Sequence, residues 1–177
     1  MDVKIFDVPI LECVTCMDMV KAIDTVQLEC EPDRHIYCHT CLVELFVKAT
    51  KDESIYPPSC CGKDIPLETV QPFLEPAQTE DFLNKSVEFR TTKRTYCHDR
   101  LCSTFIPQPE IEDNIGTCLE CDSDTCAVCK HAAHEGEDCR KDDTDRDLLY
   151  MSQREGWKRC PRCERVIGLR VGCFHIT

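Results

Sequence analysis

Seventeen cysteines, most of them in closely spaced pairs, constrain this chain of 177 residues more than any other feature. A Cys-x-x-Cys turn can hold two sulfurs about 2.3 Å from one metal ion, while amides of the loop donate hydrogen bonds to the thiolates. An odd number of cysteines also leaves one thiol unpaired in any scheme of disulfides. The spacing therefore predicts several small metal-binding units in place of one large hydrophobic core.

The compartment follows from the N-terminal residues and from the lack of long apolar segments. Residues 1–9 have neither the basic start and apolar stretch nor the cleavage site of a secretory signal. No segment approaches the roughly 18 consecutive apolar residues of a membrane span. We therefore expect a soluble, cytoplasmic protein with the nucleus as a second location and no membrane partner. Thiols stay reduced there, so paired cysteines are expected to bind Zn²⁺.

The first cysteine-rich block, which we place at residues 10–66, supplies enough ligands for two tetrahedral sites. Its eight candidates are Cys13, Cys16, Cys30, His35, Cys38, Cys41, Cys60 and Cys61. Cys60 and Cys61 are adjacent, and neighbouring side chains can chelate one metal only with an unusual backbone. Two alternatives stay open at this point: both bind the metal, or one of them is a spare thiol. We expect His39 to be an exposed bystander.

The order of these ligands resembles that of a RING finger, in which successive ligand pairs interleave. The resemblance implies one site formed by Cys13, Cys16, Cys38 and Cys41, and a second formed by Cys30, His35, Cys60 and Cys61. RING fingers usually present an apolar residue of the first Cys-x-x-Cys turn to a ubiquitin-conjugating enzyme (E2). Val14 has that position here, although a half-buried loop valine is the other interpretation. Apolar residues at helical spacing predict a helix over about residues 41–51.

The middle block, residues 97–140, again contains eight candidate ligands, but its pairs follow one another too closely to interleave. We expect one site of Cys97, Cys102, Cys118 and Cys121, and a second of Cys126, Cys129, His134 and Cys139. His131 competes for the second site, but the spacing to Cys129 and Cys139 favours His134. We expect His98 to face solvent.

This series of ligands is similar to that of the in-between-RING (IBR) domain. So few apolar residues cannot fold a domain by burial alone, whereas structural zinc supplies on the order of 10 kcal/mol per site. Four Zn²⁺ ions are thus expected within residues 13–139, and the two sites of the middle block are expected to be closed, without metal catalysis. With fourteen bound thiolates they would lower the formal net charge from -12 to about -18. Such a surface repels phosphates, so we expect no nucleic-acid partner.

Two helical linkers are expected to join the blocks. Residues 67–96 form the first, where Phe82, Phe89 and Tyr96 recur every seven residues and predict a helix over about 79–95. Residues 141–156 form the second, and Gly156 suits the end of its helix. Trp157 is expected to pack against the third block.

The third block, residues 157–177, contains Cys160, Cys163, Cys173 and His175. Cys160 and Cys163 form a further Cys-x-x-Cys pair. Nine residues separate Cys163 from Cys173, and His175 lies two residues after Cys173. From spacing alone, Cys173 and His175 can be read as the third and fourth ligands of one more zinc ion.

The three blocks together resemble the RING-between-RING-RING (RBR) E3 ubiquitin ligases over about residues 13–177. The resemblance implies small zinc-stabilised α+β modules in series, joined by helices: a RING-like cross-brace finger, an IBR domain and the start of a second RING-like block. It also implies an enzyme in which an E2 charged with ubiquitin docks on the first block.

In that family a cysteine of the last block accepts ubiquitin as a thioester and passes it to a lysine of a protein substrate. By resemblance Cys173 is this nucleophile, His175 the base, and Cys160 and Cys163 zinc ligands. The chain ends at Thr177, one residue before the family pattern places its next ligand. We therefore expect an incomplete third block with impaired transfer. A non-catalytic zinc module that docks an E2 or another partner is the alternative.

Overall fold

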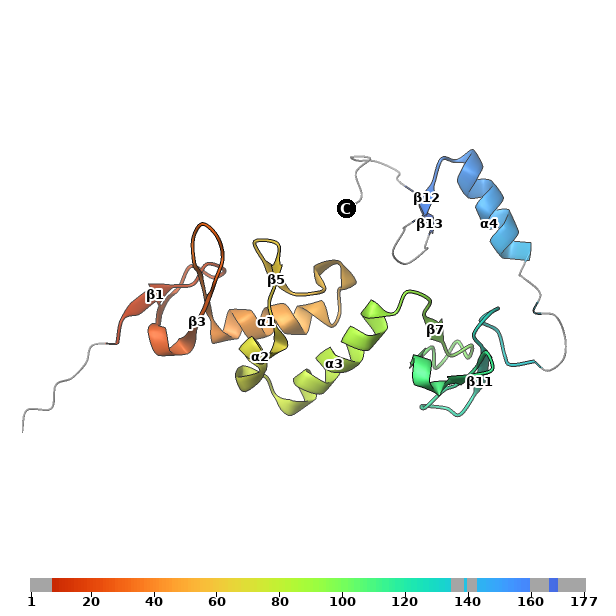
Figure 1. Cartoon of the computed structure of the whole chain (residues 1–177), viewed down its shortest axis with the longest axis horizontal. Helices are drawn as coiled ribbons and strands as arrows, with labels where there is room; N and C mark the ends of the chain where they lie inside the picture. The colour runs from red at the N-terminus through yellow and green to blue at the C-terminus, as the bar shows by residue number, and fades with distance from the viewer. Residues whose placement is uncertain (1–7, 135–138, 140–142, 160–165, 169–177) are drawn as a thin grey trace, which may run out of the picture. The chain divides into compact units, whose positions relative to one another are not determined.

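The computed structural model describes residues 8–134, 139, 143–159 and 166–168. They belong to two compact units, Met1–Phe89 and Arg90–Thr177, shown in one colour gradient in Figure 1. Both units are built of short helices and small antiparallel sheets, so the predicted class of small α+β modules in series is confirmed. Within these described ranges, no helix has both the length and the hydropathy needed to cross a membrane.

The first unit begins with two β-hairpins and continues with three helices. The hairpins pair β1 (Ile10–Glu12) with β2 (Met19–Lys21), and β3 (Thr25–Leu28) with β4 (His35–Cys38). A short hairpin of β5 (Ser59–Cys60) and β6 (Lys63–Asp64) lies between the first two helices. The helices are α1 (His39–Ala49), α2 (Leu67–Val70) and α3 (Pro76–Arg90), with 3-10 turns η1 (Ala22–Asp24), η2 (Glu53–Ile55) and η3 (Gln71–Phe73).

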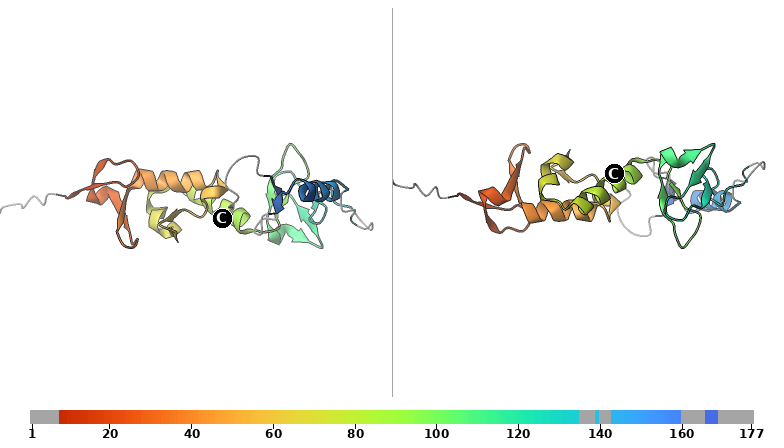
Figure 2. Two further views of the ribbon diagram at one scale, coloured as in Figure 1. Left: turned by 90° about the horizontal axis from the view of Figure 1, so that it is seen from above. Right: turned by 90° about the horizontal axis from the view of Figure 1, so that it is seen from below.

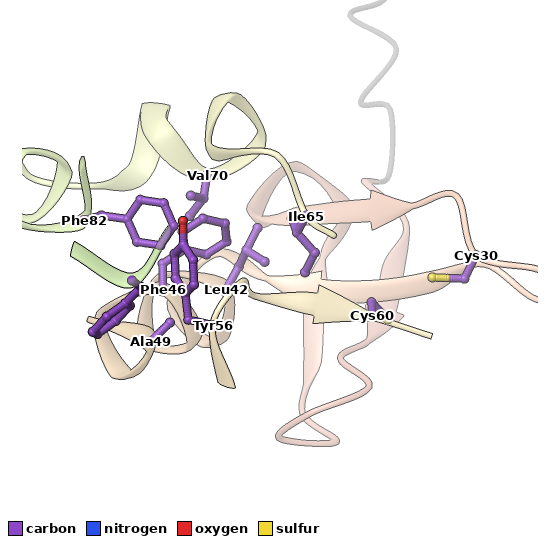
Figure 3. Packing of buried hydrophobic residues seen from close by; sticks show 10 residues of the cluster. Cys30, Leu42, Phe46, Ala49, Tyr56, Cys60, Ile65, Val70 and Phe82 are labelled. Carbon is purple, nitrogen blue, oxygen red and sulfur yellow. The ribbon is translucent and has the colours of Figure 1, made fainter. Parts of the chain in front are cut away.

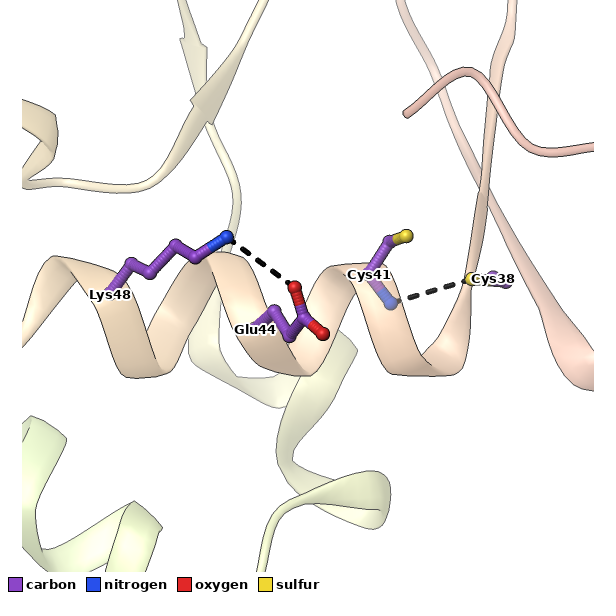
Figure 4. A network of polar contacts seen from close by, with 4 residues as sticks. All are labelled: Cys38, Cys41, Glu44 and Lys48. Atoms are coloured by element: carbon purple, nitrogen blue, oxygen red, sulfur yellow. Dashed lines mark hydrogen bonds and ion pairs between the residues drawn. The ribbon is translucent and has the colours of Figure 1, made fainter. Parts of the chain in front are cut away.

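Helix α1 starts at a cysteine. Its N-cap is Cys38, whose Sγ accepts a hydrogen bond from the amide of Cys41 at 3.4 Å (Figure 4). One turn later Lys48 and Glu44 form an exposed i,i+4 ion pair at 3.4 Å, which adds a few tenths of a kcal/mol at most. The helix expected over about 41–51 thus begins two residues earlier, because a cysteine side chain caps it.

The core of the first unit lies between α1 and α3, which run side by side in Figure 1 and Figure 2. The rings of Phe46 and Phe82 are 4.9 Å apart, and those of Tyr56 and Phe89 are 5.2 Å apart. Figure 3 shows Cys30 and Cys60 at the opposite end of this same buried cluster from Phe82. The apolar core therefore continues directly into the sulfur atoms.

Helix α3 differs from its predicted bounds of about 79–95. It ends at Arg90, and Tyr96 belongs instead to strand β7 (Thr95–Tyr96), which pairs with β8 (Phe105–Ile106). There Tyr96 packs edge-on against Phe105, with 5.8 Å between the ring centroids. The third member of the seven-residue recurrence is thus a strand residue, because cross-strand aromatic packing holds it.

The described residues of the second unit form little apolar core. Its main sheet has the order β11-β10-β9, from β9 (Ile111–Glu112), β10 (Ile115–Thr117) and β11 (Asp124–Cys126), preceded by the turn η4 (Gln108–Glu110). Ile106, Cys97 and Cys118 are the buried members of its core cluster among the described residues. Two of the three are cysteines.

The expected linker helix and the packing of the tryptophan are both present. Helix α4 spans Asp143–Arg154, and Gly156 follows it at φ +68°. The hairpin of β12 (Lys158–Arg159) and β13 (Val166–Ile167) comes next. Trp157 packs so closely on Gly168 that a Cβ there would lie 3.0 Å from the indole nitrogen.

Replacing Tyr56 by Phe should stabilise the first unit by about 1 kcal/mol. The Tyr56 hydroxyl is buried and has no hydrogen-bond partner among the described residues, so its removal relieves an uncompensated desolvation cost. Urea unfolding with saturating zinc measures the change. Tyr37→Phe is the matched control, because the Tyr37 hydroxyl donates to Cys60 Sγ and its loss should cost about 0.5–1.5 kcal/mol. Equal effects of the two substitutions would contradict this assignment.

Candidate metal centres

The structure gathers cysteine and histidine side chains at four points. Within each group the ligand atoms all lie within 4.8 Å of one another. The groups are Cys13, Cys16, Cys38 and Cys41; Cys30, His35, Cys60 and Cys61; Cys97, Cys102, Cys118 and Cys121; and Cys126, Cys129, His134 and Cys139. These are the sets expected from the sequence. The first two alternate along the chain, and the last two follow one another.

The distances between donor atoms fit tetrahedral zinc. Ligands at about 2.3 Å for sulfur and about 2.1 Å for nitrogen place two sulfurs about 3.8 Å apart, and sulfur and nitrogen about 3.6 Å apart. The sulfur pairs Cys16–Cys38, Cys97–Cys121, Cys102–Cys118 and Cys126–Cys139 measure 4.0, 3.6, 3.6 and 3.4 Å. His35 Nδ1 lies 3.3 Å from the sulfurs of both Cys60 and Cys61, and His134 Nε2 lies 3.5 and 3.3 Å from those of Cys129 and Cys139. The four groups are compatible with zinc binding.

The raised pKa values of thiols in these groups also favour a bound cation. Burial, with the sulfurs of Cys60 and Cys61 beside it, raises the pKa of Cys30 to about 11. Burial and the neighbouring Cys126 and Cys129 likewise raise the pKa of Cys139 to about 11. Thiols packed this closely cannot all ionise alone, because like charges oppose one another. A divalent cation would remove that opposition and let every sulfur bind as a thiolate.

One backbone turn recurs at these groups and was not anticipated from the sequence. In four cases the residue after the second cysteine of a pair has a left-handed conformation, with φ between 51° and 66°. These residues are Met17, Ser103, Asp122 and Lys130. At Met17, Asp122 and Lys130 the amide donates to the carbonyl of the first cysteine of the pair, at 2.8 to 2.9 Å. None of the four is glycine, the residue that favours this conformation, so sequence patterns gave no signal for the turn.

The adjacent cysteines adopt the unusual backbone that joint chelation requires. Cys61 and Gly62 are the two loop residues of the β5–β6 hairpin, with φ of +52° and +75°. Positive φ at both loop residues is typical of a type I′ turn, which favours Asn, Asp or Gly at its first position. Asp113 and Asn114 form the corresponding loop between β9 and β10. At Cys61 a cysteine occupies this position, and its sulfur reaches His35 together with that of Cys60.

The remaining histidines are held by other contacts. His39 is half-buried and stacks on Phe73 with 3.6 Å between the rings, so it is not exposed as predicted, although it lies outside the four donor groups as expected. His98 does not face solvent freely either, because both its amide and its Nδ1 lie 3.1 Å from the hydroxyl of buried Thr125. His131 Nδ1 lies 3.0 Å from the carbonyl oxygen of Cys129, apart from the donor group that contains His134.

The predicted chemistry of the third block lies outside the described residues. This holds for the candidate nucleophile Cys173 and base His175, and for the candidate ligands Cys160 and Cys163. Their roles stay predictions from the sequence.

Comparison with known proteins finds relatives along nearly the whole chain. The family model of the IBR domain, a half RING-finger domain, matches residues 77–139. The chain is 25% identical to the Arabidopsis thaliana protein named ATP-dependent RNA helicase DEAH11, chloroplastic, over 94% of this chain and 10% of the helicase. It is 26% identical to the E3 ubiquitin-protein ligase ARIH2 of Mus musculus, over 93% of this chain and 36% of ARIH2. The chain thus spans well under half the length of these curated relatives.

Among solved structures, the chain is similar to Pediculus humanus Parkin bound to phospho-ubiquitin. The identity is 22%, the match covers 93% of this chain and 58% of that chain, and the TM-score is 0.47.

Replacing Asp122 by valine should weaken the metal group that contains Cys118 and Cys121, whereas glycine at the same position should not. Asp122 is exposed and has φ +55°, which a β-branched residue adopts at a cost of about 1–2 kcal/mol and glycine adopts freely. Competition with a chelator should show earlier zinc loss for Asp122→Val only. If both variants hold zinc equally well, the left-handed turn does not support the site.

Proposed function

We propose that this chain is a member of the RING-between-RING-RING family and acts as an E3 ubiquitin ligase that holds four structural zinc ions and transfers ubiquitin through Cys173. The observation that carries the proposal is the succession of an interleaved pair of Cys/His groups and a sequential pair in one chain. The IBR match over residues 77–139 and the named activity of ARIH2 support it. A helicase activity is disfavoured, since the match covers only 10% of that relative.

The four Cys/His groups suit a structural role for zinc. Each provides four protein donors, which fills a tetrahedral coordination sphere and leaves no position for water or substrate. When bound, zinc would supply cross-links that a core as small as Ile106 and two cysteines cannot replace. The transfer chemistry is therefore assigned to a thiol, and the metal ions hold the modules in shape.

The first block offers a surface for the E2. Val14 lies in the first Cys-x-x-Cys turn and is 45% exposed, and Met17 just after it is 73% exposed. The amide of Val14 donates to the carbonyl of Ile36 at 2.8 Å, which fixes the turn on strand β4. Cys13 and Cys16 anchor the turn on both sides of Val14. An apolar side chain on a rigid turn suits an E2 with a complementary apolar groove.

The proposed reaction is two successive acyl transfers. The thiolate of Cys173 attacks the carbonyl carbon of the E2–ubiquitin thioester, a new carbon–sulfur bond forms, and the E2 cysteine leaves as a thiolate. The amine of a substrate lysine then attacks the new thioester, and Cys173 leaves as a thiolate. His175 accepts the proton of the attacking amine. An ordinary cysteine is only a few per cent ionised near neutral pH, so a nearby base also favours the first step.

Replacing Val14 by alanine should weaken E2 binding by about tenfold, because truncation of a central apolar contact at an interface costs more than about 1 kcal/mol. Isothermal titration of the chain with an uncharged E2 measures this. Val128→Ala is the matched control: Val128 is 55% exposed in a Cys-x-x-Cys turn of the second unit and should leave the affinity unchanged. Equal weakening by both changes would contradict a docking surface at Val14.

Replacing Cys173 by alanine should abolish a covalent ubiquitin adduct of the ligase. The chain is mixed with a ubiquitin-charged E2 and separated on a non-reducing gel. A thiol-sensitive adduct that disappears with Cys173→Ala supports the thioester mechanism. If E2 binds but no adduct forms with several E2 enzymes, the chain acts as a docking module, which is the alternative function.

A further inference from the structure

We propose that Cys60 and Cys61 are an oxidation site, at which a hydroperoxide joins the two adjacent sulfurs in a vicinal disulfide and releases the metal ion they hold. The inference rests on the zinc binding proposed above for the group of Cys30, His35, Cys60 and Cys61. Its product is a modified chain that has lost one zinc ion of four.

The backbone brings the two sulfurs to the same side of the hairpin. Side chains of successive residues in a strand normally point to opposite faces. Here Cys60 ends strand β5 and Cys61 turns into the left-handed conformation, so that each sulfur lies 3.3 Å from the same nitrogen, His35 Nδ1. Because the residues are adjacent, no loop has to close for the sulfurs to meet.

The two sulfurs differ in their exposure and in their hydrogen bonds. Cys60 is buried, and its Sγ accepts a hydrogen bond from the hydroxyl of Tyr37 at 3.3 Å. Cys61 is exposed, and its Sγ lies 3.3 Å from the same His35 Nδ1 that Cys60 Sγ approaches. A Cβ placed on neighbouring Gly62 would meet nothing within 4 Å of the described chain, so the tip of the hairpin is open. A small oxidant therefore reaches Cys61 first.

In the other donor group of the first unit, backbone amides donate hydrogen bonds to the cysteine sulfurs. In the group of Cys13 and Cys38, the amide of Cys38 donates to Cys13 Sγ at 3.3 Å, and that of Cys41 donates to Cys38 Sγ at 3.4 Å. Such amide hydrogen bonds withdraw electron density from a thiolate and lower its nucleophilicity. The group with the adjacent cysteines is thus expected to oxidise before this one.

The proposed reaction balances with a hydroperoxide as the oxidant. The Cys61 thiolate attacks one peroxide oxygen, a sulfur–oxygen bond forms, the oxygen–oxygen bond breaks, and hydroxide leaves from hydrogen peroxide. The Cys60 thiolate then attacks the Cys61 sulfur, a sulfur–sulfur bond forms, and a second hydroxide leaves. The peroxide is reduced by two electrons as the two thiolates become a disulfide. Only Cys30 and His35 remain as donors, which is too few to retain zinc.

The experiment first counts zinc in the intact chain by native mass spectrometry. Hydrogen peroxide is then added in steps while a colorimetric chelator reports the zinc released, and the remaining thiols are alkylated before digestion with trypsin. Cleavage after Lys51 and Lys63 gives the peptide 52–63, which contains Cys60 and Cys61 and no other cysteine. Cys30 falls in the separate peptide 22–34. When the first equivalent of zinc is released, peptide 52–63 should be found without alkylation and with a mass two hydrogen atoms below that of its reduced form.

Three results would overturn the oxidation site. The first is a cross-link between peptides 22–34 and 52–63, and the second is a sulfinic acid on Cys61. The third is loss of the first zinc ion together with oxidation of peptide 5–21 or 35–48. These two peptides contain the cysteines of the other group in the first unit. A chain that holds fewer than four zinc ions before peroxide contradicts the zinc assignment instead, and the two failures are thus distinguishable.

Tyr37→Phe serves as the matched variant because it keeps all four donors. It removes only the hydroxyl that donates to Cys60, so the same disulfide should form and the first zinc should leave several-fold faster. Dithiothreitol with added zinc should reverse the modification in both proteins. Failure of the variant to form the disulfide would contradict the proposal.

Discussion

The convergence of four sulfur or nitrogen donors at each of four points is the constraint on which this structure depends. Among the described residues outside the α1–α3 region few apolar side chains are buried, and Cys97 and Cys118 outnumber Ile106 in the core cluster of the second unit. Around the donors the backbone also adopts left-handed conformations at residues that are not glycine, each at a cost of about 1–2 kcal/mol. Only a strong local cross-link offsets such costs, and a metal–thiolate site is one.

The two donor groups of the first unit have different mechanical roles. The group with Cys13 and Cys38 fixes the turn that carries Val14 and also caps helix α1 through Cys38. The group with Cys30 and Cys60 is continuous with the apolar cluster around Phe46 and Phe82. Loss of a metal from the first group would release a surface turn, whereas loss from the second would open one end of the core. Damage at the adjacent cysteines would therefore extend beyond the hairpin that carries them.

The sequence predicted the donor groups well because ligand spacing is local information. A Cys-x-x-Cys pair limits which sulfurs can share a metal, and the RING-like order separated the alternating groups from the sequential ones. The helical spacing of apolar residues likewise predicted α1 to within two residues.

What the sequence did not predict depends on how distant segments meet. The stacking of His39 on Phe73 and the contact of His98 with Thr125 join segments about 30 residues apart, and no short pattern contains such information. For Cys61 the sequence indicated only that joint chelation needs an unusual backbone. It did not specify the left-handed turn, since cysteine has no preference for that conformation and closure of the donor group imposes it. Tyr96 illustrates a third case, in which a helical periodicity continues by chance into a strand.

Helix α3 shows that the boundary of a family match in the sequence can differ from the boundary of a compact structural unit. The IBR family match begins at residue 77, near the start of α3, yet Phe82 and Phe89 of this helix belong to the core of the first unit. A fragment cut at residue 77 would leave Phe46 and Tyr56 of the first unit uncovered and would attach two bare aromatic rings to the second. The natural place to divide this protein is after α3, about one helix later than the family boundary.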